Sequence, residues 1–459
     1  MENREQYKRL IMFFASALIL LVQVVIFYYI WHRYYNYRSV IGALYWRRGN
    51  WALMGVYAFI NFFFSKIFGA YKVGYLKVSD VIASQILAVL CCNGVTYMQL
   101  ALIGRWRFSA YLEPIMQMTL YDVVAVIAWV IFMRWIYAKI YPPRQMLLVC
   151  YDRDPDDMIN KMSSRQDKYE ICDIADLNEE SLESVCDMVT EYEAVLIYDI
   201  PAYERNIILK RCFTESVRTY VTPKISDILL RGADNIHLFD TPLYLSRNQG
   251  LSADQLMFKR LLDLVVCIPV SVVLMPLFLI ISLMIKLYDG GPVLYKQPRL
   301  TINGKVFNIY KFRSMRMDSE KEGAQLAKKH DDRVTPIGRV LRALHFDEFP
   351  QLINIIKGDM SLVGPRPERP EIAEQYKEVI PEFDFRLKVK AGLTGYAQVY
   401  GKYNTTPYDK LKLDLTYIEN YTFWLDIKLM FLTFKILFQK ENTEGIDANQ
   451  VTAIKKTRE

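Results

Sequence analysis

The sequence has few cysteines for its length, and they are not spaced as a disulfide framework would be. Seven cysteines are scattered over 459 residues, only Cys91 and Cys92 are adjacent, and there is no Cys-x-x-Cys. This pattern predicts reduced thiols, in the cytosol or in lipid. The chain also starts with Met-Glu-Asn-Arg-Glu, which carries acids, and shows no cleavage site. The first apolar run is therefore expected to be a retained membrane anchor.

Strong charge of one sign is also missing. The formal net charge is only +7, and the sequence contains no nucleic-acid-binding motif, so we expect no nucleic-acid partner. A mild positive charge suits a protein that lies against an anionic membrane surface. Hydrophobic residues make up 52% of the chain, which is high for a soluble protein, and they are clumped. The length alone predicts two or three domains.

Four apolar runs in residues 1–140 predict a transmembrane region of four helices. Each run is close to the roughly 20 residues that a spanning helix needs. A buried helix of a soluble protein is the alternative for any one run, but four in succession favour the membrane. Four spans return the chain to its starting side, and the lysines and arginines of the loops do not decide which side that is. The runs are Leu10–Ile30, Trp51–Ala70, Val81–Ile103 and Ile115–Tyr137.

Residues 141–240 change to alternating strand and helix patterns, which predicts a doubly wound, Rossmann-like α/β module. A dinucleotide-binding module would carry Gly-x-Gly-x-x-Gly in its first turn. Here that turn reads Cys150-Tyr-Asp-Arg-Asp-Pro155, which has no glycine and has two aspartates that would repel a pyrophosphate. We therefore predict a non-catalytic module for assembly or regulation, and a degenerate ligand site remains open. The strands are expected at Met146–Cys150, Tyr169–Asp173, Ala194–Tyr198 and Val217–Val221.

A polar segment at residues 241–256 predicts a linker, and a fifth apolar run lies within residues 257–288. The run is long enough to span a membrane. However, Pro276 sits in its middle and removes one helical hydrogen bond, which bends or breaks a helix. A bent helix can enter the bilayer and leave on the same side. The pattern alone leaves a plain spanning helix and a re-entrant helix open.

Residues 289–440 carry the charged groups that point to chemistry. Asn303-Gly304 between apolar stretches predicts a β-hairpin. The alternation of Lys311 and Arg313 on its return strand would place two cations on one face, which suits the diphosphate of a nucleotide sugar or is simply a solvated face. Residues 318–332 are expected to form a loop, and residues 441–459 a polar tail.

The stretch Arg342–Arg369 surrounds one short predicted helix. Pro350 suits its start and Gly358 its end. Apolar residues at i, i+3, i+4 and i+7 predict one buried face. These residues are Phe349, Leu352, Ile353 and Ile356.

The predicted helix places Asp347 and Glu348 at its N-terminus. Two adjacent carboxylates repel each other, so they call for a divalent cation or for nearby arginines. Arg342, Arg366 and Arg369 are the candidate arginines, and the stiff Gly-Pro-Arg-Pro turn suits an arginine that must be held still. This combination predicts phosphate chemistry on Mg²⁺. A plain helix cap is the alternative for the acidic pair.

This stretch resembles the signature of the bacterial sugar transferases, which are monotopic polyprenyl-phosphate phosphoglycosyl transferases. Their usual form is Ser-Leu-Asp-Glu-Leu-Pro-Gln, then Asn-Val-Leu-Lys-Gly-Asp-Met-Ser, then Val-Gly-Pro-Arg-Pro. Here His345 and Phe346 replace Ser-Leu, and Phe349 replaces Leu. The resemblance covers about Lys259–Lys440.

Two further segments resemble the family but depart from it. Arg386–Gln398 matches Arg-His-x-Val-Arg-Pro-Gly-Ile-Thr-Gly-x-Ala-Gln, with Leu387 for His, Lys390 for Arg and Ala391 for Pro. In the fifth apolar run, Met275 stands before Pro276 where the family has serine. The resemblance implies a re-entrant helix bent at Pro276, followed by an α/β catalytic domain.

The resemblance implies transfer of a sugar 1-phosphate from a UDP-sugar to undecaprenyl phosphate, with release of UMP, at the start of surface polysaccharide synthesis. Asp347 would be the nucleophile, and Glu348 would hold Mg²⁺. Substrate phosphates would meet Lys311, Arg313, Arg342, Arg366, Arg369 and Lys390. The implied location of the catalytic domain is the cytoplasmic face of the bacterial inner membrane. We expect the N-terminus inside because the chemistry needs cytosolic nucleotide, and the N-terminal half invites self-association. Two rivals are a non-enzymatic scaffold or sensor that acts through the α/β module, and a multi-spanning transferase, for which there are too few apolar runs.

Overall fold

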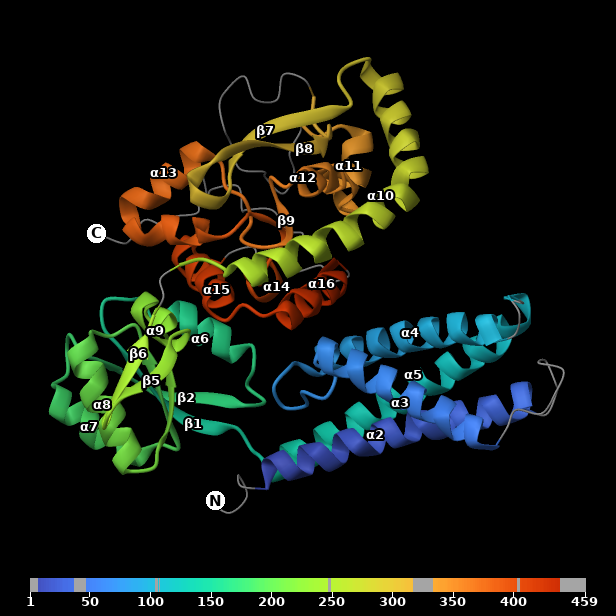
Figure 1. Cartoon of the computed structure of the whole chain (residues 1–459). Helices are drawn as coiled ribbons and strands as arrows, with labels where there is room; N and C mark the ends of the chain where they lie inside the picture. The colour runs from blue at the N-terminus through green and yellow to red at the C-terminus, as the bar shows by residue number, and fades with distance from the viewer. Residues whose placement is uncertain are drawn as a thin grey trace. The chain divides into compact units, whose positions relative to one another are not determined.

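The computed structural model describes residues 7–36, 47–103, 106, 108–246, 249–316, 333–402 and 405–437. The predicted loop at 318–332 and the predicted tail at 441–459 lie outside the described residues. The chain divides into two compact units, Met1–Pro223 and Lys224–Glu459 (Figure 1).

The four predicted membrane helices are confirmed. They are α2 (Lys8–Ile30), α3 (Arg47–Phe68), α4 (Val78–Ile103) and α5 (Ser109–Ile140). Each contains a segment long and apolar enough to cross a membrane. A short π-helix, η1 (Trp31–Asn36), extends α2. Side chains from α2, α4 and α5 form an apolar core inside the bundle, including Ile19, Val89 and Val126.

A buried polar cluster joins three helices of this bundle. Asp122 on α5 is fully buried. Its Oδ2 accepts hydrogen bonds from Asn93 Nδ2 of α4 at 3.1 Å and from Tyr57 Oη of α3 at 3.4 Å. Asn93 Nδ2 also lies 2.9 Å from Thr119 Oγ1. Polar contacts of this kind hold membrane helices in one register, since lipid tails offer no competing partner.

The predicted doubly wound module is also confirmed. Its strands are all parallel, in the order β2-β1-β3-β4. The central strand β3 is apolar throughout and β1 is apolar from Met146 to Cys150, because helices cover both faces of the sheet and produce two cores. The strands are β1 (Arg144–Cys150), β2 (Tyr169–Asp176), β3 (Ala194–Tyr198) and β4 (Arg218–Val221). The helices are α6 (Asp156–Ser163), α7 (Leu182–Met188), η2 (Val189–Glu191) and α8 (Ala202–Thr214).

The second unit starts with α9 (Ile225–Arg231), whose Ile225 and Ile228 pack into the C-terminal core. An antiparallel hairpin follows, made of β5 (Asp234–Leu238) and β6 (Thr241–Leu245). The prediction of a linker at 241–256 was therefore wrong at its start. The proline and serines there suggest a loop, but the five residues Thr241–Leu245 pair with β5.

The fifth apolar run is one continuous helix, α10 (Ala253–Asp289), with Pro269 and Pro276 inside it. Pro276 does not break the helix, but α10 changes direction along its length in Figure 1. Prolines are the usual cause of such bends. Gly290, in the left-handed conformation at φ 67°, ends the helix.

The rest of the second unit starts with a second antiparallel hairpin, followed by the elements that carry the acidic pair. β7 (Leu294–Leu300) and β8 (Val306–Phe312) pair antiparallel, and Asn303 and Gly304 both take positive φ in the turn η3 (Ile302–Gly304), as predicted. After this hairpin come α11 (Pro336–Ala343), η4 (Phe346–Glu348), α12 (Gln351–Lys357) and β9 (Ser361–Val363), the last three within the stretch Arg342–Arg369. Next come α13 (Pro370–Val379), η5 (Pro381–Lys388), β10 (Gly392–Thr394), α14 (Tyr396–Tyr400), α15 (Pro407–Glu419) and α16 (Phe423–Leu437).

The predicted buried face of α12 was only partly right. Leu352 is buried, but Ile353 is 38% exposed, and Asn354 and Ile355 are fully buried instead. Asn354 turns inward because its side chain completes the edge of β8. Its Oδ1 accepts from the backbone N–H of Tyr310 at 2.9 Å, and its Nδ2 donates to the carbonyl of Asn308 at 2.8 Å. These two bonds replace a strand partner, which an apolar pattern does not reveal.

Candidate active site

The acidic pair lies in a tight turn between two helices. His345 ends the approach from α11 in the left-handed conformation, with φ 56°. The turn η4 follows and carries Asp347 and Glu348 directly before α12. Asp347 is buried, with 9% of its surface exposed. The backbone therefore presents both carboxylates at the start of α12, as the sequence predicted.

Glu348 forms ion pairs with two cations from distant parts of the chain. Lys311 Nζ, on β8, lies 2.7 Å from Glu348 Oε1, and Arg366 Nη2 lies 2.8 Å from the same oxygen. Both contacts use Oε1, and Oε2 takes part in neither. The arginine is half exposed, so its guanidinium is also accessible to a substrate. Strand β8, the acidic turn and the Gly-Pro-Arg-Pro turn thus meet at the carboxylate of Glu348.

The two carboxyl groups have pKa values shifted in opposite directions. Burial raises the pKa of Asp347, and the adjacent charge of Glu348 raises it further, against the opposing effect of Lys311 and Arg342. Burial alone would raise the pKa of Glu348 as well. Arg366 and Lys311 outweigh that effect and hold the pKa of Glu348 well below its usual range. One acid is therefore firmly ionised, and its neighbour is a more basic carboxylate.

The other four predicted cations lie at different distances from the two carboxylates. Arg342 donates from Nε to Ser314 Oγ at 2.9 Å, while its charge still acts on Asp347. Arg313 is buried just beyond the end of β8. Arg369 occupies the N-cap position of α13, and its side chain makes no capping hydrogen bond there. Lys390 lies at the opposite end of α12, where its Nζ would be 3.8 Å from a Cβ on Gly358, the C-cap residue, and where Arg260 is close to it.

The Gly364-Pro-Arg-Pro turn that presents Arg366 is held at several points. Arg386 Nη2 donates to the carbonyl of Arg366 at 3.0 Å, and Arg299 Nη1 donates to the carbonyl of Pro367 at 3.0 Å. A Cβ on Gly364 would lie 2.4 Å from the carbonyl oxygen of Lys390, so only glycine fits. The backbone of Arg366 is therefore fixed before any substrate binds.

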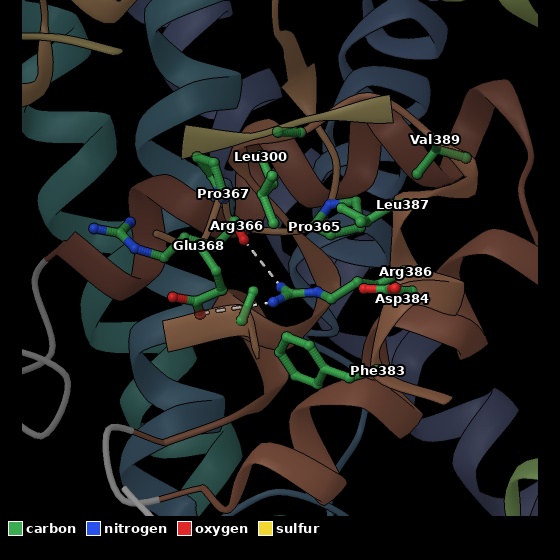
Figure 2. Close-up of a pocket in the computed structure, with 12 residues that line it drawn as sticks. Leu300, Pro365, Arg366, Pro367, Glu368, Phe383, Asp384, Arg386, Leu387 and Val389 are labelled. Carbon is green, nitrogen blue, oxygen red and sulfur yellow. Dashed lines mark hydrogen bonds and ion pairs between the residues drawn. The ribbon is translucent and has the colours of Figure 1, made fainter. Parts of the chain in front are cut away.

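Figure 2 shows a small pocket behind this turn. Arg386 reaches across it toward the carboxylate of Glu368 and the carbonyl of Arg366, while the guanidinium of Arg366 points away from the pocket. The pocket is lined mainly by apolar side chains, such as Leu300, Phe383 and Leu387. It belongs to the support of the turn, and the acidic pair is not part of its lining.

Sequence reasoning missed several residues that build the site. Asn354, Arg299 and Arg386 position the turn and β8 through backbone carbonyls and amides, and nothing in their spacing indicates that role. Asn354 carried a signal only because it lies inside the family signature. Ser314, the partner of Arg342, carried a similar signal from its place directly after Lys311-Phe-Arg.

A Mg²⁺ ion at the acidic pair would have to be shared with a substrate. Among the described residues, no group of three or more His, Cys, Asp or Glu side chains converges as a complete metal site. Mg²⁺ commonly uses one or two carboxylates together with water and substrate phosphates, so a complete protein cage is not needed. Glu348 is ionised, and its Oε2 is outside the two ion pairs. Glu348 is therefore the residue that would hold such an ion together with a substrate.

Comparison with known proteins supports the resemblance. Residues 254–440 match the family described as bacterial sugar transferase. The chain is 37% identical over 232 residues to the UDP-N-acetylgalactosamine-undecaprenyl-phosphate N-acetylgalactosaminephosphotransferase of Aeromonas hydrophila, covering 50% of this chain and 54% of that protein. It is 37% identical over 209 residues to the UDP-glucose:undecaprenyl-phosphate glucose-1-phosphate transferase of Klebsiella pneumoniae, covering 44% and 43%. The chain thus spans about half the length of these two relatives.

A relative that is matched over most of its length is the UDP-glucose:undecaprenyl-phosphate glucose-1-phosphate transferase of Caulobacter vibrioides. The identity is 39% over 189 residues, which is 40% of this chain and 71% of that protein. The acidic turn, the Gly-Pro-Arg-Pro turn and β8 all lie within the matched family region. The chain belongs to the bacterial sugar transferase family.

Proposed function

We propose that the protein transfers a sugar 1-phosphate from a UDP-sugar to undecaprenyl phosphate and releases UMP. The single observation that carries this proposal is the buried Asp347 beside an ionised Glu348 that is held by Lys311 and Arg366. The names of these relatives give this class of donor and acceptor. The product would start the synthesis of an exopolysaccharide, a capsule or an O-antigen.

The first step forms a phosphosugar-enzyme intermediate. A carboxylate oxygen of Asp347 attacks the sugar-bearing phosphorus of the donor, and a new P–O bond forms to the aspartate. The bond from that phosphorus to the bridging oxygen breaks, and its electron pair leaves with UMP. The raised pKa of Asp347 makes its carboxylate a better nucleophile than an ordinary aspartate.

Glu348 and its two cations prepare the site for a diphosphate. Arg366 offers a planar, half-exposed guanidinium that can hold a phosphate with two hydrogen bonds. Lys311 supplies a point charge from β8. Mg²⁺ held at Glu348 would neutralise charge on the diphosphate and on the leaving UMP. Arg313, Arg342, Arg369 and Lys390 remain proposed substrate contacts.

The second step needs an acceptor delivered from the membrane. An oxygen of undecaprenyl phosphate attacks the phosphorus of the intermediate, and the bond to Asp347 breaks to restore the carboxylate. We propose that α10 enters the bilayer and returns at the bend near Pro276, which keeps the catalytic domain on the cytoplasmic face of the inner membrane. The bend and the apolar surface of α10 support this arrangement. The α/β module is proposed to serve assembly or regulation.

We expect the detergent-purified protein to release UMP from one UDP-sugar when Mg²⁺ and undecaprenyl phosphate are present. UMP is measured with UDP-glucose, UDP-galactose and UDP-N-acetylgalactosamine, with and without EDTA. EDTA should abolish release, and added Mg²⁺ should restore it. The absence of release with every UDP-sugar tested on folded protein would favour the rival, a membrane scaffold or sensor that acts through the α/β module.

The rate should fall as the pH falls, because Asp347 attacks only as a carboxylate. Burial and Glu348 raise its pKa, so protonation sets in at a higher pH than for an ordinary aspartate. The acid limb of kcat/KM for the UDP-sugar should therefore lie above the usual aspartate range. Stopped assays of UMP across pH 4 to 9 check this. An acid limb within the ordinary range would argue against a buried nucleophile.

A further inference from the structure

The start of α10 carries three charged residues that enter the catalytic domain. Lys259, Arg260 and Asp263 lie within the first three turns of the helix. Lys259 and Asp263 are only 4% and 3% exposed. Charges are rarely buried to this extent unless each has a specific partner.

Arg260 holds the C-terminal end of α12. Its Nη1 donates to the carbonyl of Ile355 at 2.5 Å, and its Nη2 donates to the carbonyl of Ile356 at 2.7 Å. The last carbonyls of a helix lack partners inside the helix, and a cation there also suits the helix dipole. The helix has only seven residues, which is about 10 Å of length. Its other end carries the acidic turn with Asp347.

Asp263 holds β9. Its Oδ1 accepts from the backbone N–H of Leu362 at 2.8 Å and from Ser361 Oγ at 3.0 Å. The partner strand β10 pairs with Ser361 and Val363, so the N–H of Leu362 faces the other way and Asp263 takes the place of a second strand. The chain runs from β9 directly into the turn that presents Arg366.

Lys259 supports β9 from a second direction. Its Nζ lies 2.6 Å from Asp426 Oδ2 and 2.9 Å from Tyr417 Oη. Tyr417 Oη lies 2.7 Å from Asp426 Oδ1 and 3.4 Å from the carbonyl of Val363. The same turn of the membrane helix is thus tied to α15, to α16 and to the end of β9.

We propose that Arg260 and Asp263 are positioning residues that set the distance between the acidic turn and Arg366. Arg260 fixes α12, which follows Glu348, and Asp263 fixes β9, which precedes Arg366. The ion pair between Glu348 and Arg366 closes this arrangement. The membrane helix therefore does more than anchor the enzyme, because it forms the common base of both halves of the site. This inference rests on the proposed function for its kinetic test.

The kinetic test uses Arg260→Met, Arg260→Lys, Asp263→Leu and Asp263→Asn in the full-length protein. A displacement of about 1 Å can cost about a hundredfold in rate. We expect Arg260→Met and Asp263→Leu to lower kcat about 10- to 100-fold, with KM for the UDP-sugar changed less than about threefold. Arg260→Lys keeps a donor and Asp263→Asn keeps Oδ1, so both should recover most of kcat. Lys286→Gln is the control, because its Nζ donates to the carbonyl of Gly290 at the far end of α10.

Hydrogen–deuterium exchange provides a readout that does not need activity. Arg260→Met should speed exchange in peptides across 346–357, and Asp263→Leu should speed it across 361–366. The other peptides should match the wild type, which separates a positioning role from general unfolding. Unchanged exchange across 346–366, or kcat kept within about twofold in both variants, would overturn the inference. If the wild type itself releases no UMP, the proposed function fails, and the exchange data still decide this inference.

Discussion

Replacement of Asp347 by asparagine is expected to abolish UMP release, with kcat lowered at least about a thousandfold. Asparagine has nearly the same shape but no nucleophilic carboxylate oxygen. The substitution also removes a buried charge next to Glu348, so the fold should not lose stability. Binding of the UDP-sugar, measured by calorimetry, should persist because Lys311, Glu348 and Arg366 are unchanged.

The covalent step gives this prediction a second readout. With a donor that carries ³²P in the sugar phosphate, and without undecaprenyl phosphate, the wild type should become labelled and the Asp347→Asn protein should not. Asp254→Asn is the matched control, because Asp254 is exposed at the start of α10 and should leave both label and rate unchanged. Substantial turnover by the Asp347→Asn protein would exclude Asp347 as the nucleophile. A labelled Asp347→Asn protein would place the covalent bond elsewhere.

Replacement of Lys259 by methionine is expected to destabilise the catalytic unit by about 3–5 kcal/mol. Lys259 and Asp426 form a buried ion pair at 2.6 Å, with side chains 5% and 1% exposed. Burial raises the pKa of Asp426 even beside the lysine. Without the lysine, the carboxylate would keep the hydroxyl of Tyr417 as a neutral partner and lose its counter-charge.

Denaturant unfolding of the purified protein, followed by tryptophan fluorescence, measures this loss. The pKa of Asp426 is raised in the folded state, so the folded protein holds this proton more tightly than the unfolded chain does. The contribution of that proton to the free energy of unfolding is present at low pH and is lost as the pH rises through the folded-state pKa. The deficit of Lys259→Met should therefore be larger at higher pH.

The double variant Lys259→Met with Asp426→Leu should recover much of it, since an apolar pair can replace a buried ion pair. Lys377→Met removes an exposed ion pair with Asp384 and should change nothing measurable. A small, pH-independent effect of Lys259→Met would show that Asp426 finds another partner.

The sequence predicted those parts of the fold that depend on local patterns. The apolar runs, the alternating module, the Asn303-Gly304 turn and the stop at Gly358 each follow from spacing or from a backbone preference of a few residues. The acidic pair at the start of α12 followed in the same way. These features need no knowledge of which distant segments meet.

The remainder of the site depends on contacts between distant segments. Arg260 meets the carbonyls of Ile355 and Ile356 about 95 residues away along the chain, and Asp263 meets Leu362. A charge at the start of an apolar helix looks the same in sequence whether it faces water or a protein backbone. The prediction of the buried face of α12 was partly wrong for the same reason, because the side chain of Asn354 bonds to the backbone of β8.

The departure from the family at Ala391 has a local explanation in the structure. The backbone N–H of Ala391 donates to Thr301 Oγ1 at 3.1 Å. A proline at this position has no N–H and could not make that bond. The turn after β7 and the strand β10 are thereby linked in this chain by a hydrogen bond that the usual family residue does not allow.

The carboxylate of Asp122 constrains how the ribosome and the insertion machinery can assemble the membrane bundle. A lone aspartate at the centre of a membrane helix costs about 2.5–3.5 kcal/mol during insertion. Its two partners, Tyr57 and Asn93, lie on α3 and α4, which are synthesised before α5. The earlier helices are therefore already in place to accept the polar face of α5 as it leaves the translocation channel. Synthesis from N- to C-terminus thus places Tyr57 and Asn93 ahead of Asp122, so that Oδ2 of this carboxylate has both of its partners available when α5 enters lipid.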